Sequence, residues 1–189
     1  MFGLSTWNKF VIIVIVLMLL FSAFLLTGQW KELGKLFYPL PYREDIFRYS
    51  RQFDLDPYFI AAVMRVESRY YSKALSKRGA RGLMQLMPET ARWVAGQMNI
   101  EYNDELLYQP DYNIQLGCWY LANLLVEFQG NFAAVLAAYN GGRGRVARWL
   151  DEGTWDGRLE STADIPFPET RTFVDRVWRD YQIYRHIYN

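Results

Sequence analysis

The sequence of 189 residues is poor in cysteine and histidine, with one of each. Cys118 has no partner with which to form an intrachain disulfide. Metal sites of the usual nitrogen and sulfur type need several such side chains, so we predict neither a metal site nor a cofactor. A Ser-His-Asp triad would have to use His186, three residues from the C-terminus, and no nucleophile motif accompanies that histidine. Triad and metal chemistry are therefore set aside.

An excess of charge of either sign is also lacking. The 21 basic and 20 acidic side chains give a formal net charge of +1, which provides no electrostatic footprint for binding nucleic acid. Internal repeats, low-complexity tracts and alternating strand patterns are absent, although a short hairpin near the loops remains compatible with the sequence. The length suits one compact domain with an appendage.

Long uncharged runs are absent except near the N-terminus. The run from Phe10 to Leu26 is dominated by Val, Ile, Leu and Phe, and as a helix it would span roughly 26 Å, close to the lower limit for crossing a bilayer. Trp7 and Trp30 flank it as interfacial aromatic residues would. A cleaved signal peptide is the alternative, but Ser22-Ala23-Phe24, inside the run, makes a poor cleavage site. We therefore expect an uncleaved anchor.

The remaining sequence predicts a linker followed by an all-α domain. Pro39 and Pro41 are expected to hold the linker extended next to the membrane. The expected domain organisation is a short cytoplasmic head (1–9), a transmembrane anchor (10–27), a linker (28–41) and a helical domain (42–189). Helices are expected over 43–53, from Pro57, from near Pro88 to residue 98, from Pro110, over 132–140, from Val146 and after Pro168. Loops are expected over 99–109 and 151–164.

The candidate catalytic residue is Glu67. It lies seven residues after Ile60, on the apolar stripe of a helix that Asp56 caps and Pro57 begins. Burial on that stripe disfavours the charged form of a carboxyl group and raises its pKa, which suits a general acid. The alternative is a surface glutamate paired with Arg65 or Arg69.

Four motifs in order carry a family resemblance. Glu67-Ser68, Gly82-Leu83-Met84-Gln85 and Ala138-Tyr139-Asn140 resemble the motifs of the transglycosylase SLT domain, the family 1 lytic transglycosylases of the lysozyme-like superfamily. Ile165-Pro166-Phe167-Pro168-Glu169-Thr170-Arg171 resembles the C-terminal motif of that family. The resemblance covers roughly residues 42–188. It implies a lysozyme-like helical domain on the outer side of the cell membrane that acts on peptidoglycan glycan strands.

The resemblance also implies a mechanism. Glu67 would protonate the oxygen that links N-acetylmuramic acid to N-acetylglucosamine, while the muramoyl acetamido oxygen stabilises the anomeric carbon. The ionised Glu67 would then deprotonate the muramoyl 6-hydroxyl, which closes a 1,6-anhydro ring without water. The usual second carboxylate of glycosidases has no motif of its own here, and the acidic candidates are Asp104, Glu105, Asp111 and Glu169.

Further site residues follow from matched motif positions. Those expected to bind substrate are Ser76, Gln85, Met87, Tyr139, Asn140 and Glu169. For Glu169 the alternative is a first-turn carboxylate favoured by the helix dipole. Arg69-Tyr70-Tyr71 departs from the family pattern, so the turn after the Glu67 helix is expected to differ. A goose-type-lysozyme-like hydrolase and a non-catalytic cell-wall-binding protein remain alternative functions, and protein partners are left open.

Overall fold

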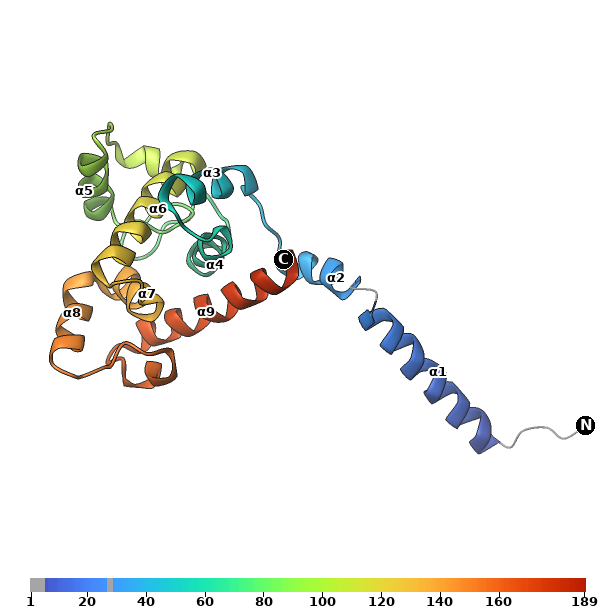
Figure 1. The fold of residues 1–189 in the computed structure, drawn as a ribbon. Coiled ribbons are helices and arrows are strands. Elements are labelled where there is room, and N and C mark those ends of the chain that lie inside the picture. Colours follow the sequence, from blue (N-terminus) through green and yellow to red (C-terminus); the bar gives the residue numbers. More distant parts are fainter. Residues whose placement is uncertain (1–5, 27–28) are drawn as a thin grey trace, which may run out of the picture. The chain divides into compact units, whose positions relative to one another are not determined.

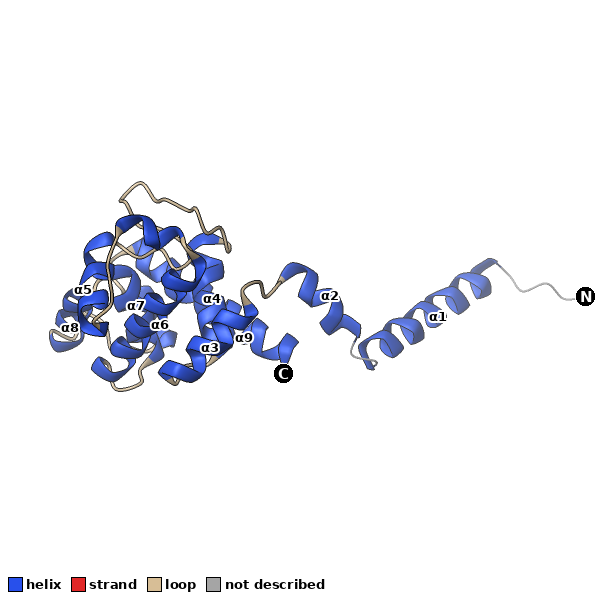
Figure 2. Ribbon diagram, turned by 90° about the horizontal axis from the view of Figure 1, so that it is seen from above, coloured by secondary structure: helices blue, strands red, loops and turns tan. Residues whose placement is uncertain are grey.

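The computed structural model describes residues 6–26 and 29–189. It forms two compact units: Met1–Pro39 with His186–Asn189, and Leu40–Arg185. Helices and loops make up the part of the chain that is described, and no strand occurs in it (Figure 2). The predicted all-α class is confirmed. Residues 1–5, 27 and 28, which belong to the predicted head, anchor and linker, lie outside the described residues, and the four domain boundaries stay a prediction.

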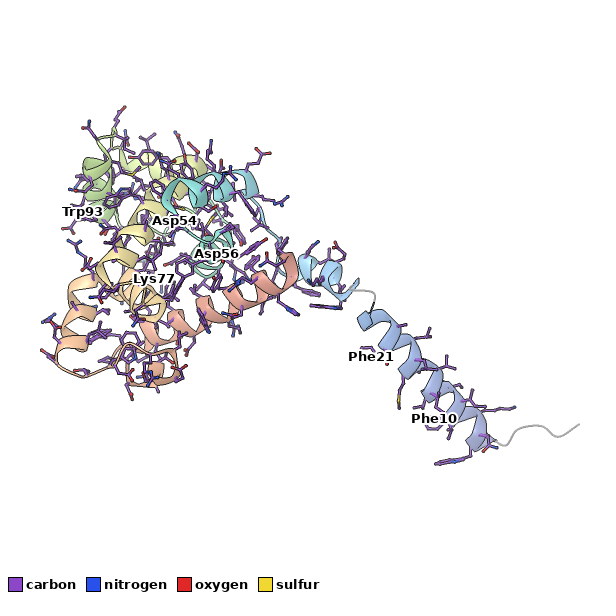
Figure 3. The ribbon with its side chains drawn as sticks, viewed as in Figure 1. Phe10, Phe21, Asp54, Asp56, Lys77 and Trp93 are labelled. Atoms are coloured by element: carbon purple, nitrogen blue, oxygen red, sulfur yellow. The ribbon has the colours of Figure 1, made fainter. Side chains whose placement is uncertain are left out.

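The first unit contains the apolar helix α1, Thr6–Leu26. Its window Thr6–Ala23 has a mean hydropathy of 2.1 and is long and apolar enough to cross a membrane, by length and composition. None of this window is buried within the structure, and Figure 3 shows Phe10 and Phe21 projecting from the helix. The structure therefore contains the predicted N-terminal apolar helix, which begins before Phe10.

The prediction of an extended linker is wrong for residues 29–37, which form helix α2, Gln29–Phe37. The two prolines restrict only the residues just before them, and both lie beyond the end of the helix. Within α2, the Lys35 ammonium lies 2.6 Å from the Glu32 carboxylate, an ion pair at the i, i+3 spacing that helices favour. Apolar side chains recur on the other side of the helix. The amphipathic pattern of residues 29–37 is therefore sufficient for a helix, although two prolines follow it.

The second unit is built from nine further helical elements. Asp56 caps α4 by accepting a hydrogen bond from the Tyr58 amide at 2.8 Å, and Asn131 caps α7 by accepting one from the Ala134 amide at 3.1 Å. The predicted cap at Asp56 is confirmed. The elements are α3 (Arg43–Phe53), α4 (Pro57–Ser68), α5 (Pro88–Met98), η1 (Asp104–Tyr108), α6 (Pro110–Glu127), α7 (Phe132–Gly141), α8 (Arg143–Asp151), η2 (Leu159–Asp164) and α9 (Pro168–Tyr188).

Two predicted loops and one predicted helix start differ from the structure. The two predicted loops contain the short 3₁₀ helices η1 and η2, and α8 begins at Arg143 instead of Val146. At Gly142 the backbone has φ +94°, which glycine adopts without strain, so α8 follows α7 directly. The turn before α5 carries isolated antiparallel bridges that pair Arg81 with Leu75 and with Leu86. This is the short hairpin-like element that the sequence left open.

Helix α6 is the centre of the second unit. It packs against α3, α5, α7 and η1, as can be followed in Figure 1. Cys118 is completely buried in α6 and is part of the core. Gly117 on the same helix faces Met84, where an added Cβ would lie 2.2 Å from the sulfur atom. The turn that contains Met84 therefore packs directly against the backbone of the central helix.

Candidate active site

Helix α4 places Glu67 in the lining of a groove. The apolar residues on the preceding turns, Ile60, Val63 and Met64, are completely buried. Glu67 belongs to the last turn of the same helix and keeps partial access to solvent. The groove has a volume of about 430 Å³, and the end of α4, the end of α7 and the first turns of α9 form its walls.

Glu67 is an acid held in its neutral form. Burial, and secondarily the negative charge of Glu169, raises its pKa to about 8. Among the described residues no cation forms a salt bridge with Glu67. Arg65, one of the two candidate partners, instead donates to the buried carboxylate of Asp180 at 3.1 Å, and the other, Arg69, forms no salt bridge with Glu67. The alternative of a surface ion pair is therefore wrong, and Glu67 is protonated at neutral pH.

Tyr139 lies beside Glu67. Its hydroxyl donates to the Met84 carbonyl at 2.8 Å, and its ring stacks on Phe173 with 6.4 Å between centroids. Burial raises the pKa of Tyr139 well above its ordinary value, and the charge of Glu67 adds to the increase. Tyr139 is therefore a neutral phenol that joins α7, α9 and the turn of residues 82–86 next to the acid.

The turn of residues 82–86 is held in place by Asn113, which the sequence analysis missed. The Asn113 side chain accepts from the Met84 amide at 2.7 Å and donates to the carbonyls of Arg81 and Leu107 at 3.0 and 2.8 Å. Asn113 is completely buried on α6, so these bonds satisfy polar groups that water cannot reach. The sequence feature that could have indicated this role is the amide side chain of Asn113 on an otherwise apolar face of the helix.

Gln85 adopts a left-handed backbone with φ +47°, which is uncommon for a residue other than glycine. Its side-chain nitrogen donates to the Gly82 carbonyl at 2.9 Å and to the Ala74 carbonyl at 3.2 Å. Ser68 donates to the Leu83 carbonyl at 2.7 Å and so connects the end of α4 to this turn. The side-chain nitrogen of Gln85 is thus engaged within the loop.

The structure brings only part of the predicted set into one groove. Asn140 and Glu169 line it together with Glu67, whereas Ser76, Gln85, Met87 and Tyr139 are not among the residues that line it. The Asn140 amide oxygen accepts from the Thr170 hydroxyl at 2.9 Å. Ser76 accepts from the Ala80 amide at 2.9 Å and closes the turn there, and Met87 is the partly exposed residue before α5. Substrate contacts of all these residues remain predictions.

Glu169 is exposed in the first turn of α9, where its charge is favoured by the helix dipole. Its carboxylate lies 3.2 Å from the guanidinium of Arg78, which belongs to the loop between α4 and α5. The position of Glu169 is therefore compatible with both interpretations from the sequence, a substrate-binding residue and a carboxylate favoured by the helix dipole. Among the described residues, no group of three or more His, Cys, Asp or Glu side chains is placed to hold a metal ion.

Replacing Glu169 tests the electrostatics of the groove. We expect Glu169→Gln to lower the pKa of Glu67, because removing the negative charge makes the ionised form of Glu67 less unfavourable. The pKa is measured by NMR titration of the labelled Glu67 carboxyl carbon. Glu105→Gln is the matched control, since Glu105 also pairs with an arginine, Arg81 at 3.8 Å, but does not affect Glu67. An unchanged or higher pKa in Glu169→Gln would contradict this account.

These features define a class of protein: a lysozyme-like helical domain whose groove surrounds one protonated carboxyl group. The sequence model of the family described as transglycosylase SLT domain matches residues 44–160. The chain belongs to this family, as its four motifs predicted.

Curated relatives and solved structures agree with this assignment. The soluble lytic murein transglycosylase of Salmonella typhimurium is 38% identical over 162 residues, which are 83% of this chain and 25% of the relative. The membrane-bound lytic murein transglycosylase C of Actinobacillus pleuropneumoniae is 29% identical over 73% of this chain and 44% of its own length. The 70 kDa soluble lytic transglycosylase of Escherichia coli has a TM-score of 0.78 and 32% identity, over 82% of this chain and 26% of its own.

An informative structural neighbour is the lytic transglycosylase Slt of Pseudomonas aeruginosa. It has a TM-score of 0.73 and 35% identity over 82% of this chain and 25% of its own, and it was solved as an inactive mutant with glutamine in place of a glutamate. The chain spans about a quarter of the length of the soluble relatives that it matches. The membrane-bound relative and the apolar helix α1 together indicate membrane anchoring.

Proposed function

We propose that this protein is a lytic transglycosylase that cleaves the β-1,4 bond between N-acetylmuramic acid and N-acetylglucosamine in peptidoglycan. The observation that carries the proposal is a single carboxyl group, Glu67, whose pKa is raised to about 8 in the groove of an SLT domain. The names of the relatives, and the inactive mutant of the Pseudomonas enzyme, support the same activity.

The raised pKa suits both steps that Glu67 performs. As a neutral acid it donates its proton to the glycosidic oxygen when the bond breaks, and the resulting carboxylate accepts the proton of the muramoyl 6-hydroxyl. A pKa near the working pH makes each transfer feasible. The nucleophile, the muramoyl 6-hydroxyl, belongs to the substrate. The 1,6-anhydro ring therefore forms within one sugar, where the effective concentration of the hydroxyl is high. We expect Tyr139, which lies beside Glu67, to help position the acid, and Asn140, which lines the groove, to contact the sugar.

A hydrolase is the second candidate, because Glu169 places another carboxylate in the groove. In that case Glu169 would activate a water molecule while Glu67 acts as the acid. The family of the chain and the names of its relatives favour the first proposal. A wall-binding protein without activity is disfavoured by the elevated pKa of Glu67, which binding alone does not require.

Product mass distinguishes the candidates. We expect digestion of purified sacculi by the full-length protein in mild detergent to release muropeptides with 1,6-anhydro ends, each lighter by one water than the hydrolytic product. Liquid chromatography with mass spectrometry measures the ratio. Digestion in water labelled with oxygen-18 is the control, because a transglycosylase incorporates no label into the new end. Reducing, labelled ends would establish the hydrolase, and no release would favour a binding protein.

We further propose that the protein is anchored in the cell membrane by α1 as a single span, with the catalytic domain on the outer side. The length and hydropathy of α1 and the membrane-bound relative support the anchor. The outer location follows from the substrate, because peptidoglycan lies outside the cell membrane. The charges flanking the span, Lys9 on one side and Lys31 and Lys35 on the other, give little orientation by themselves.

A further inference from the structure

Helix α2 has one apolar side that the structure leaves open. Leu33, Leu36 and Phe37 follow the i, i+3, i+4 spacing and share one face. Their exposed fractions are 50%, 75% and 67%, which is high for large apolar side chains gathered on nine residues. Lys31 and Lys35, four residues apart, share the opposite side of the helix.

The adjacent side of α2 is already occupied by the C-terminal residues. The Trp30 ring stacks on His186 with 4.6 Å between centroids, and an added Cβ at Gly34 would lie 2.9 Å from a side-chain carbon of Ile187. The Tyr188 hydroxyl donates to the Tyr38 carbonyl at 2.8 Å, and the Lys35 ammonium lies 5.6 Å from the centre of the Tyr188 ring. The C-terminal tail thus fixes α2 without covering its leucine side.

We propose that the side of α2 formed by Leu33, Leu36 and Phe37 lies in the headgroup layer of the membrane that α1 crosses. Only two residues separate the end of α1 from the start of α2, and they can span roughly 10 Å at most. The headgroup layer on each side of the hydrocarbon core is roughly 5–8 Å thick. The open apolar side therefore begins within reach of the lipid.

The charge pattern agrees with this occupant. Helices that lie in the membrane interface place large apolar residues on one side and lysines on the other, where they meet anionic lipid headgroups. Lys31 and Lys35 occupy that position here. The inference rests on the anchor proposed above, and it adds that a second element, held by the C-terminal tail, lies along the membrane surface.

The test uses the full-length protein in liposomes that contain anionic lipid. A fluorophore is attached to Leu36→Cys or, as the matched control, to Lys31→Cys on the opposite side of α2. Because the native Cys118 is completely buried, the introduced cysteine is the labelled one, and labelling of the unmodified protein measures any background. Fluorescence at each position is then quenched in two ways, by a lipid that carries a nitroxide near its headgroup and by iodide in the water.

We expect the lipid quencher to act several-fold more strongly at position 36 than at position 31, and iodide to show the reverse order. Equal quenching at the two positions would overturn the inference. Shielding of position 36 from both quenchers would also overturn it, since a second copy or another part of the chain would then cover this side. Alkaline carbonate extraction tests the anchor separately: release of the protein overturns both proposals, whereas retention with equal quenching overturns this one alone.

Discussion

Replacing Glu67 by glutamine is expected to reduce turnover of peptidoglycan by about 10³-fold or more, because the same carboxyl group supplies the acid and the base. Glutamine has nearly the same shape and resembles the neutral form that the groove favours at neutral pH. Binding of glycan strands should therefore persist. The measurement compares anhydro-muropeptide release with retention on sacculi in a sedimentation assay. Unchanged turnover would exclude Glu67 as the acid.

The same substitution should change how stability depends on pH. An ordinary glutamate of the unfolded chain has a pKa near 4.5, and the folded value is about 8. Between these values the folded state retains a proton that the unfolded state has lost, so the wild type loses stability as pH rises through this range. Each unit of difference corresponds to about 1.4 kcal/mol, which gives a total loss of a few kcal/mol.

Glu67→Gln lacks this titration, so its free energy of unfolding should exceed that of the wild type by an amount that grows from pH 5 to pH 8. Denaturation in mild detergent, followed by tryptophan fluorescence, measures the difference at each pH. Glu105→Gln serves as the control, because this glutamate is exposed and lies outside the groove. A constant difference between Glu67→Gln and the wild type would mean that the carboxyl group is not sheltered.

Gly82→Ala is expected to be the most destabilising single change near the site, by about 3 kcal/mol or more. At this residue φ is +77°, and an added Cβ would lie 2.1 Å from the Leu107 carbonyl oxygen and 2.3 Å from the Asn113 side-chain nitrogen. Backbone and a buried amide cannot move aside as a flexible side chain would. The turn of residues 82–86 should shift, which displaces Gln85 and lowers activity as well.

Gly79→Ala is the matched control. Gly79 also has a positive φ, +91°, but no atom lies within 4 Å of its added Cβ. Its cost should be limited to the backbone term of about 1–2 kcal/mol. Thermal unfolding and product release are measured for both variants. Equal losses of stability would show that the backbone conformation alone, and not the contact with Leu107 and Asn113, makes glycine necessary at position 82.

Local signals in the sequence were sufficient for much of the helical framework. Asp56 with Pro57, Pro88 and Asn131 act within one turn of the helices that they begin, so neighbouring residues determine these starts. The position of Glu67 on an apolar stripe likewise depends only on helical spacing, and this position predicted that burial would raise its pKa. The prediction of an extended linker missed α2. Pro39 and Pro41 restrict only the residues just before them, and α2 ends at Phe37.

The tertiary structure alone decided how the motifs meet. Asn113 holds the turn around Met84 through bonds that cross about thirty positions of the sequence, and no local pattern reports such partners. The pairing of Glu169 with Arg78 and its effect on Glu67 likewise depend on three separate segments folding together. The sequence by itself therefore determined which carboxyl group is the candidate acid, because helical periodicity is local. Which residues surround that acid depended on long-range packing.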